Sequence, residues 1–364
     1  MRLGVEAALV GSELVRGDVA IEDGAVAAVG LPSANGRGLA APGFVDLQVN
    51  GFAGVDFLGA GEAAYRSAGE RLLETGVTAY LPTLITSPEE RLLDALAAVP
   101  RTQVAPRVLG VHLEGPFLSP ERLGTHPPEA RRDPDLELAA RLLDAGPVRL
   151  VTLAPELRGA LDLARFLAGR GVAVSCGHSD ATAEQAHAAF DAGVRAVTHV
   201  FNAMRPIAHR EPGVAAVALA RDDVVVQVIV DGIHLAPDTV RLVWRAAGGR
   251  VALVTDAMAA ARAGDGRFRL GEVDVVVRDG VARREGDGVL AGSVLTMVEA
   301  VRNLHRLGVP LAHALAAASA VPARLLGRRD LGRLEPGARA DVVVLDDALE
   351  VRRVLVGGET HVAA

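Results

Sequence analysis

The chain of 364 residues is 50% hydrophobic and carries a formal net charge of −7, which suits a large globular domain with a small companion and argues against nucleic acid as the main partner. No apolar run reaches the roughly 18 residues of a membrane-spanning helix, so we expect no membrane partner. All 38 basic residues are arginine, which excludes catalytic or metal-bridging lysines, and the single cysteine, Cys176, excludes an internal disulfide and favours a reducing cytoplasm.

Both ends of the chain contain short strand-like segments with turn residues between them. Residues 20–26 place an Asp-Gly pair between apolar stretches, which is a hairpin signal, and residues 341–345 and 351–356 show the same strand pattern. Neither end has enough apolar surface to fold alone. We therefore predict one small β-sandwich domain, built from residues 1–41 and 335–364.

Strand-like and helix-like segments alternate between these ends. This alternation of eight strands with helical crossovers favours a closed (β/α)8 TIM-type barrel over an open sheet, and we predict it over residues 42–334. The predicted strands are 44–49, 76–81, 107–113, 148–153, 171–176, 196–200, 224–230 and 251–255. The predicted helices include 62–74, 87–98, 135–144, 158–169 and 180–192.

Two local patterns add detail to the barrel. Asp180 is a candidate N-cap for the helix at 180–192, and Glu184 lies in its first turn, where the helix dipole favours an acid. Residues 264–288, after the last barrel strand, read as an inserted hairpin. The sequence leaves open whether this hairpin packs on the small domain or borders the active site.

Four residues that suit a catalytic metal site follow short apolar, β-branched runs: Glu114, His178, His199 and Asp256. The carboxyl ends of barrel strands meet at one mouth, so separate strands can deliver side chains to one ion. A solvated strand end or a hydrogen-bonded core histidine would explain any one of them alone. Four such positions together predict a metallohydrolase.

The residue types divide the work of such a site. One carboxylate and two imidazoles, from Glu114, His178 and His199, leave a coordination position for water, as catalytic zinc requires. Bound water has a pKa near 7, and Asp256 can take its proton and pass it to a leaving nitrogen; the alternative is that Asp256 caps a following helix. His112 and Cys176 share strand faces with Glu114 and His178, so we expect them one layer deeper.

Seven short motifs follow one another along the chain. They are His-Leu-Glu-Gly-Pro-Phe at 112–117, Gly-His-Ser at 177–179, Thr-His-Val-Phe-Asn-Ala-Met at 198–204, Arg-Glu-Pro-Gly at 210–213, Asp-Gly-Ile-His at 231–234, Thr-Asp-Ala at 255–257 and Leu-Ala-Gly-Ser at 290–293. Each motif alone is weak, but the ordered set is specific. It resembles the N-acetylglucosamine-6-phosphate deacetylases of the amidohydrolase superfamily, and the resemblance runs from Pro42 to Asp341.

The resemblance implies an activity and roles for matching residues. Glu114, His178 and His199 would bind one divalent metal, and Asp256 would be the general acid and base. His126 would help to polarise the acetyl carbonyl, although a lone histidine in such a loop is ordinarily exposed. The reaction would release acetate and glucosamine 6-phosphate from N-acetylglucosamine 6-phosphate, in amino-sugar catabolism or recycling.

The resemblance also implies a substrate site and an assembly. Asn202, Ala203 and His234 would hold the sugar and its phosphate. Arg210 would reach the phosphate from the neighbouring subunit of a homodimer, and a planar, permanently charged guanidinium suits a phosphate dianion. The alternative for Arg210 is a surface ion pair with Glu211.

The first predicted strand departs from the wider superfamily. Many amidohydrolases have His-x-His there, whereas this chain has Gln48 and Asn50. Neutral amides are poor zinc ligands, so we predict one metal per chain, zinc first, with iron, cobalt or manganese open. Gln48 and Asn50 are then expected to orient the bound water or the ligands through hydrogen bonds.

Four other functions compete with this interpretation. A hydrolase of cyclic amides is disfavoured by the missing lysine and the missing His-x-His. N-acetylgalactosamine 6-phosphate differs from the proposed substrate in one hydroxyl, and no residue in the sequence can be assigned to reading it. An unphosphorylated or muropeptide-type substrate would leave Arg210 without a role. A catalytically silent sugar-phosphate-binding protein would have no need of Asp256.

Overall fold

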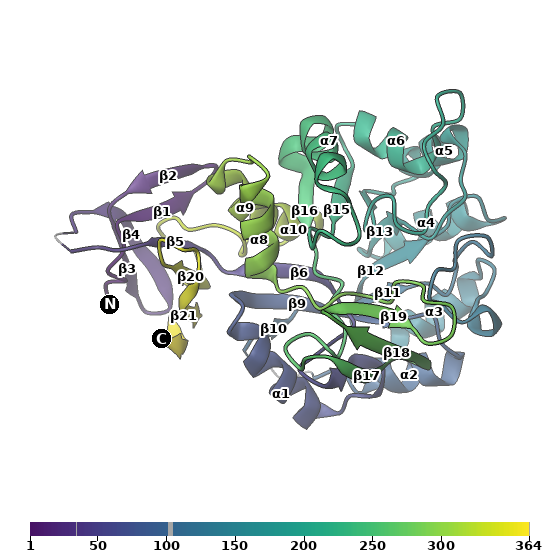
Figure 1. The fold of residues 1–364 in the computed structure, drawn as a ribbon, viewed down its shortest axis with the longest axis horizontal. Coiled ribbons are helices and arrows are strands. Elements are labelled where there is room, and N and C mark those ends of the chain that lie inside the picture. Colours follow the sequence, from purple (N-terminus) through teal and green to yellow (C-terminus); the bar gives the residue numbers. More distant parts are fainter. Residues whose placement is uncertain (34, 101–104, 364) are drawn as a thin grey trace.

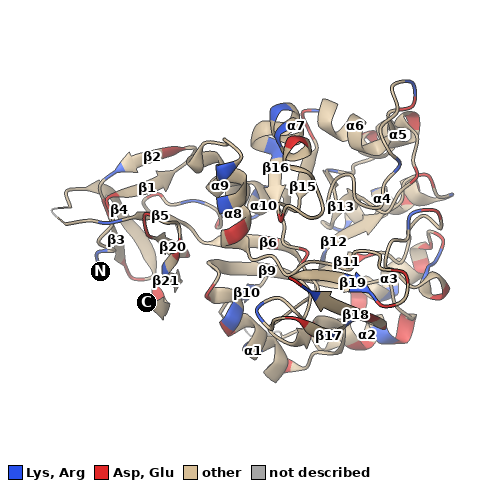
Figure 2. Cartoon of the chain, in the orientation of Figure 1, with Lys and Arg blue, Asp and Glu red and all other residues tan. Residues whose placement is uncertain are grey.

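The computed structural model describes residues 1–33, 35–100 and 105–363. A barrel surrounded by helices occupies one side of Figure 1, and the strands from both chain ends lie together on the other side. Within the described ranges, none of the helices is long and apolar enough to cross a membrane. Charged residues of both signs are interspersed over the outer helices and loops (Figure 2).

Eight parallel strands form the barrel wall, which confirms the predicted TIM-type fold. In order around the barrel they are β6 (Phe44–Val49), β9 (Val77–Ile85), β11 (Val111–Glu114), β12 (Val148–Leu153), β13 (Ala173–Cys176), β14 (Ala196–Val197), β15 (Val225–Val228) and β16 (Val251–Leu253). A short strand, β10 (Arg107–Val108), also pairs with β9. The first and last strands meet through backbone bonds, because Asp256 N–H donates to Gln48 O at 3.0 Å and Asn50 N–H to Ala257 O at 2.7 Å.

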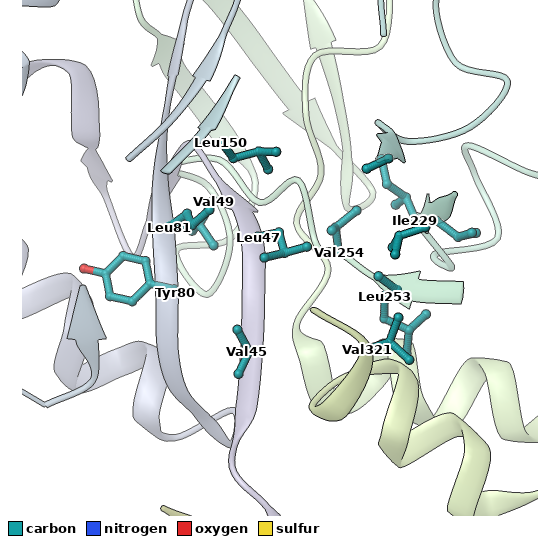
Figure 3. Close-up of a cluster of buried hydrophobic side chains, with 14 of the residues drawn as sticks. Val45, Leu47, Val49, Tyr80, Leu81, Leu150, Ile229, Leu253, Val254 and Val321 are labelled. Carbon is teal, nitrogen blue, oxygen red and sulfur yellow. The ribbon is translucent and has the colours of Figure 1, made fainter. Parts of the chain in front are cut away.

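Helices alternate with these strands and cover the barrel, as the sequence predicted (Figure 1). They are α1 (Glu62–Leu73), α2 (Glu89–Ala97), α3 (Leu136–Ala145), α4 (Ala160–Gly169), α5 (Ala183–Asp191), α6 (Gly213–Ala220), α7 (Pro237–Ala247), α8 (Met297–Arg306), α9 (Leu311–Ala317) and α10 (Ala320–Leu325). Figure 3 shows buried hydrophobic side chains of the core that the barrel strands share with the surrounding helices, including Leu47 of β6, Leu253 of β16 and Val321 of α10. Each such side chain contributes about 1.5–3 kcal/mol by leaving water, which makes this scaffold a firm support for the site.

The predicted N-cap of α5 was wrong. Thr182 caps this helix and forms a capping box with Gln185, while Glu184 does lie in the first turn as expected. The Asp180 carboxylate instead accepts hydrogen bonds from Arg122 at 2.7 Å and from Arg205 at 2.5 Å. Two guanidinium groups outcompete backbone amides for a carboxylate because both charges gain from the contact.

Strands from both chain ends build the small β unit, as predicted. Its main sheet has the order β2 (Glu13–Arg16), β1 (Ala7–Val10), β5 (Leu39–Pro42), β20 (Val342–Leu345), β21 (Val351–Val356) and β22 (Glu359–Ala363). The hairpin of β3 (Asp18–Glu22) and β4 (Ala25–Leu31) turns at Asp23 and Gly24, whose φ angles of 48° and 76° are typical of an Asp-Gly hairpin turn. An apolar core of its own, with Val19, Ile21 and Val342, packs inside. The exact domain limits stay a prediction, and Ala364 lies outside the described residues.

The inserted hairpin is three-stranded and borders the barrel mouth. Its antiparallel strands are β17 (Gly266–Leu270), β18 (Val273–Arg278) and β19 (Val281–Arg284), so the structure adds one strand to the predicted pair. Leu270 from this sheet and Leu290 just after it line the cavity at the mouth. The insertion hairpin, as we call residues 266–284, therefore belongs to the active site and not to the small β unit.

Candidate active site

The three predicted metal ligands converge at the barrel mouth. Glu114 ends β11, while His178 and His199 follow β13 and β14. Glu114 Oε1 lies 3.1 Å from His178 Nε2 and 2.8 Å from His199 Nε2, and one ligand atom from each residue lies within 4.8 Å of the others. All three side chains are buried, so three separate strands present one compact cluster of donor atoms.

The cluster fits a divalent cation. Zinc bonds of about 2.0–2.1 Å place tetrahedral ligand atoms about 3.3 Å apart, close to the distances found here. His178 Nδ1 donates to Arg122 O at 2.9 Å, which keeps the lone pair of its Nε2 free to bind a metal. His199 Nδ1 is buried and has no hydrogen-bond partner among the described residues.

The charge of this cluster resides on Glu114. Burial alone would raise the pKa of Glu114, but the imidazoles of His126, His178 and His199 beside the carboxylate hold that pKa well below its usual range. Burial alone would lower the pKa of His199, whereas its contact with the Glu114 carboxylate raises it. The buried carboxylate is therefore ionised, which is the form that binds a cation.

Asp256 follows β16 and faces the same cavity. Burial first, and then the negative charge of Glu114, raise the pKa of Asp256 to about 6. A carboxyl group that titrates near neutrality suits proton transfer. The chain after Asp256 leads into β17 and not into a helix, so the helix-capping alternative is wrong.

The amides of Gln48, on β6, and of Asn50, directly after β6, contact the two functional carboxylates. Gln48 Nε2 donates to Glu114 Oε1 at 3.0 Å, and Asn50 Nδ2 donates to Asp256 Oδ1 at 2.7 Å. Each amide therefore turns its N–H toward a carboxylate and fixes the orientation of that carboxylate.

His126 is buried against the cluster, so the alternative of an exposed loop histidine is wrong. Thr86 N–H donates to His126 Nδ1 at 3.2 Å, while His126 Nε2 lies 3.6 Å from Glu114 Oε2. Burial, together with the neighbouring His178, lowers the pKa of His126 to about 4, which makes the ring neutral at pH 7. Because Nδ1 accepts a hydrogen bond, the single ring proton sits on Nε2 and is offered to the site.

The predicted substrate residues surround a cavity of about 400 Å³. Asn202, Ala203 and His234 line it together with the cluster. The His234 Nδ1–H group bonds to Asp231 Oδ2 at 2.7 Å, which leaves Nε2 available to a ligand. Asn202 Nδ2 donates to His199 O at 3.1 Å, so this side chain also fixes the turn that carries a predicted metal ligand.

Arg210 stands apart from the other predicted residues. It is exposed and does not line the cavity of its own chain. The alternative ion pair with Glu211 is absent from the contacts among the described residues, and Glu211 Oε1 instead accepts from Ala183 N–H at 2.8 Å.

A buried chain of polar side chains lies below the cluster, and His112 belongs to it as expected. His112 Nε2 lies 2.7 Å from Thr152 Oγ1, and Thr198 Oγ1 lies 2.7 Å from Thr152 and 2.6 Å from Ser175 Oγ. Ser175 thus faces the barrel interior, which places Cys176 on the opposite strand face and overturns its predicted position. The alternation failed because the chain leaves the strand before His178, whose φ is +47°.

Sequence reasoning missed three supporting groups: the Thr86 N–H, the Arg122 carbonyl and the Asp231 carboxylate. Two of these are backbone groups, which carry no residue-specific signal. Asp231 could have been found, because an acid three residues before a functional histidine is well placed to orient its ring.

Comparisons with known proteins agree with this geometry. Residues 39–361 match the model of the Amidohydrolase family. The chain is 41% identical to the N-acetylglucosamine-6-phosphate deacetylase of Bos taurus, over 88% of this chain and 82% of the relative. It is 39% identical to the N-acetylgalactosamine-6-phosphate deacetylase of Escherichia coli O157:H7, over 88% of this chain and 87% of that protein.

Solved structures give the same result. A variant of N-acetyl-D-glucosamine-6-phosphate deacetylase from Mycobacterium smegmatis, in complex with N-acetyl-D-glucosamine-6-phosphate, superposes with a TM-score of 0.95. It is 41% identical, and the match covers 100% of this chain and 99% of that one. The corresponding enzyme of Thermotoga maritima matches with a TM-score of 0.90 at 33% identity, over 100% of both chains. The chain is therefore a member of the amidohydrolase family and belongs among its N-acetylglucosamine-6-phosphate deacetylases.

Proposed function

We propose that this protein hydrolyses the acetamide of N-acetylglucosamine 6-phosphate, releasing glucosamine 6-phosphate and acetate. The observation that carries the proposal is the buried Glu114–His178–His199 cluster with Asp256 beside it in one cavity. Metal-assisted amide hydrolysis needs a cation site and a nearby group that transfers protons, and Asp256, whose pKa is raised to about 6, lies next to the cluster. The relatives named above support the choice of substrate.

The residues around the cavity suit each part of this reaction. When bound, a divalent cation would supply Lewis-acid polarisation and a water of lowered pKa. Asp256 accepts the proton of the attacking water and delivers it to the amide nitrogen, so that a C–O bond forms while the C–N bond breaks. His126 Nε2–H donates to the carbonyl oxygen as that atom gains negative charge, and Gln48 and Asn50 hold the two carboxylates in place.

The residues of the site also bear on the identity and number of the metal ions and on the cellular location of the protein. A site with one carboxylate and two imidazoles suits zinc, and it also accepts iron, cobalt or manganese. One ion per chain is supported by the amides of Gln48 and Asn50, which bond to carboxylates and offer no imidazole for a second ion. A cytoplasmic location is supported by the free thiol of Cys176.

The phosphate is best accommodated beside Asn202 and Ala203. Asn202 and Ala203 line the cavity, and the side-chain amide of Asn202 supplies a polar group there. Arg210 lies in the same loop between β14 and α6, where Ile207 is also exposed, at 45%. Because Arg210 lies outside the cavity of its own chain, we propose that it enters the cavity of a second subunit in a homodimer.

Mixed dimers test this role of Arg210. Arg210→Ala and Asp256→Asn chains, each poorly active alone, are co-expressed, and the whole mixture of dimers is purified. If Arg210 acts across the interface, each mixed dimer contains one complete site out of two. Random association makes about half of the dimers mixed, so the mixture should show about a quarter of wild-type activity. Arg245→Ala, which alters an arginine in the last turn of α7, is the control and should leave activity unchanged.

The mixed dimers behave differently if Arg210 acts within its own chain. If Arg210 serves its own chain, mixing restores nothing, because the Asp256→Asn chain lacks the proton acceptor and the other chain lacks the arginine. A monomer in solution that is fully active would also contradict the proposal.

Acetate release from a panel of four sugars tests the function itself. The panel contains N-acetylglucosamine and N-acetylgalactosamine, each with and without the 6-phosphate, and the metal content is measured on the same preparation. We expect rapid release from N-acetylglucosamine 6-phosphate and at least about 100-fold lower kcat/KM without the phosphate, since a lost ion-pair contact costs about 3 kcal/mol.

Each alternative has its own outcome in this panel. Faster release from the galacto epimer would favour the second candidate, which the 39% identical galactosamine relative supports. Equal rates with and without phosphate would contradict the proposed phosphate site. No release from any sugar, with metal bound, would point to a hydrolase of other amides or to a silent sugar-phosphate-binding protein.

A further inference from the structure

The insertion hairpin lies against the loop that carries His126. Side chains alternate along β19, so Ala282 and Arg284 share one face while Arg283 points the other way. Ala282 is buried and Arg283 is exposed, which shows that the face with Arg284 is the one turned toward the barrel. The proposed chemistry assigns no role to this hairpin beyond covering the cavity.

The insertion hairpin makes two contacts with the surroundings of His126, and the side chain of Arg284 makes the first of them. Its Nη1 donates to Gly124 O at 3.1 Å, while its Nε donates to Asp287 Oδ1 at 3.0 Å, so the guanidinium is held from both sides. Gly124 lies two residues before His126. The φ of Gly124 is +58°, and a Cβ added at this residue would lie only 3.4 Å from His178 Cε1. The loop therefore passes closely over His178 at this point.

The apolar face of the insertion hairpin makes the second contact. Its buried residues Leu270, Val275, Val277 and Ala282 form a separate core with Ile85 at the end of β9. Ile85 precedes Thr86, whose N–H donates to His126 Nδ1 at 3.2 Å. The hairpin therefore braces both the loop before His126 and the backbone group that holds its ring.

We propose that Arg284 is a positioning residue for His126, and that the insertion hairpin sets the place of this electrophilic N–H within the site. The inference rests on the proposed function, because it takes the role of His126 from there. Polar groups that stabilise developing charge act only when they are held within a fraction of an ångström, so a side chain that fixes their loop affects the rate without touching substrate.

A double-mutant cycle separates this role from a merely structural one. Arg284→Ala is compared with Arg283→Ala, whose guanidinium donates to Gly288 O on the outer face, both in the wild-type chain and in a His126→Ala chain. We expect Arg284→Ala to lower kcat about 10-fold with KM and metal content unchanged, and Arg283→Ala to have no effect. In the His126→Ala chain the effect of Arg284→Ala on kcat should shrink to less than about 2-fold, because the imidazole that Arg284 positions is absent.

Amide hydrogen exchange provides a readout that does not depend on turnover. The His126 N–H donates to Leu123 O at 3.0 Å, and its exchange should become faster in Arg284→Ala and stay unchanged in Arg283→Ala. Equal losses of kcat in both backgrounds, or unchanged exchange at His126, would overturn the inference. A wild-type protein that releases no acetate would overturn the proposed function, and the exchange comparison would still decide the role of Arg284.

Discussion

Replacing Asp256 by asparagine is expected to lower kcat for deacetylation by about 10²–10⁴-fold, the range that general acid–base catalysis contributes. The amide can keep the contact with Asn50 but cannot accept a proton from water or deliver one to the leaving nitrogen. Asp256 is not part of the Glu114–His178–His199 cluster, so the metal content should stay at the wild-type level. Steady-state kinetics and metal analysis on one preparation measure both quantities.

The pH dependence of the wild type gives an independent check on Asp256. Burial and the neighbouring Glu114 carboxylate raise the pKa of Asp256 to about 6, and the reaction needs its ionised form. The value of kcat/KM should therefore fall as the pH drops through about 6, and this acid limb should vanish in Asp256→Asn. Asp162→Asn, on the exposed surface of α4, is the matched control. Asp256→Asn turnover close to wild type would remove the proton-transfer role.

Removing one predicted metal ligand is expected to abolish both metal binding and turnover. In His178→Ala only two ligands remain, the Glu114 carboxylate and the His199 imidazole, and two-ligand sites bind divalent ions far more weakly than three-ligand sites. We expect the metal content to fall from about one ion per chain to less than about a tenth, with a loss of kcat/KM of at least about 10³-fold. Elemental analysis and acetate release test the two parts separately.

An exposed histidine provides the control for this substitution. His187→Ala, on α5, removes an imidazole of the same type and should change neither quantity. Chelation of the wild-type metal should abolish activity reversibly, and added zinc should restore it. Full metal content in His178→Ala, or activity that survives complete chelation, would show that the cluster is not the metal site.

The sequence predicted the barrel and the place of the cluster because both follow local rules. Apolar runs mark the strands, and functional residues such as Glu114 and His199 stand at their carboxyl ends, where a parallel barrel brings them together. The amides of Gln48 and Asn50 were also predictable, since a neutral group at a ligand position is left with hydrogen bonding as its role.

The failures arose where contacts come from distant segments. Local sequence predicts Asp180 as a helix cap, but Arg122 and Arg205, which lie 58 and 25 residues away in the chain, bind its carboxylate instead. The strand alternation that placed Cys176 beneath His178 ends where the backbone turns to positive φ. The support of His126 by a backbone N–H of Thr86 depends on how two loops pack, which local patterns do not encode.

The central position of β5 in the small unit bears on the order in which the molecule can be completed during synthesis. Ala40 pairs with Ala8 on one side and with Val344 on the other, so one neighbour of this strand precedes the barrel in the chain and the other follows the barrel. Until β20 is synthesised, one edge of β5 offers unpaired amides and carbonyls, and its apolar core lacks Val342 and Leu355. The barrel residues of a nascent chain are therefore synthesised while this half-sheet is still open to neighbouring chains, and the pairing of β20 with β5 closes the open edge against aggregation.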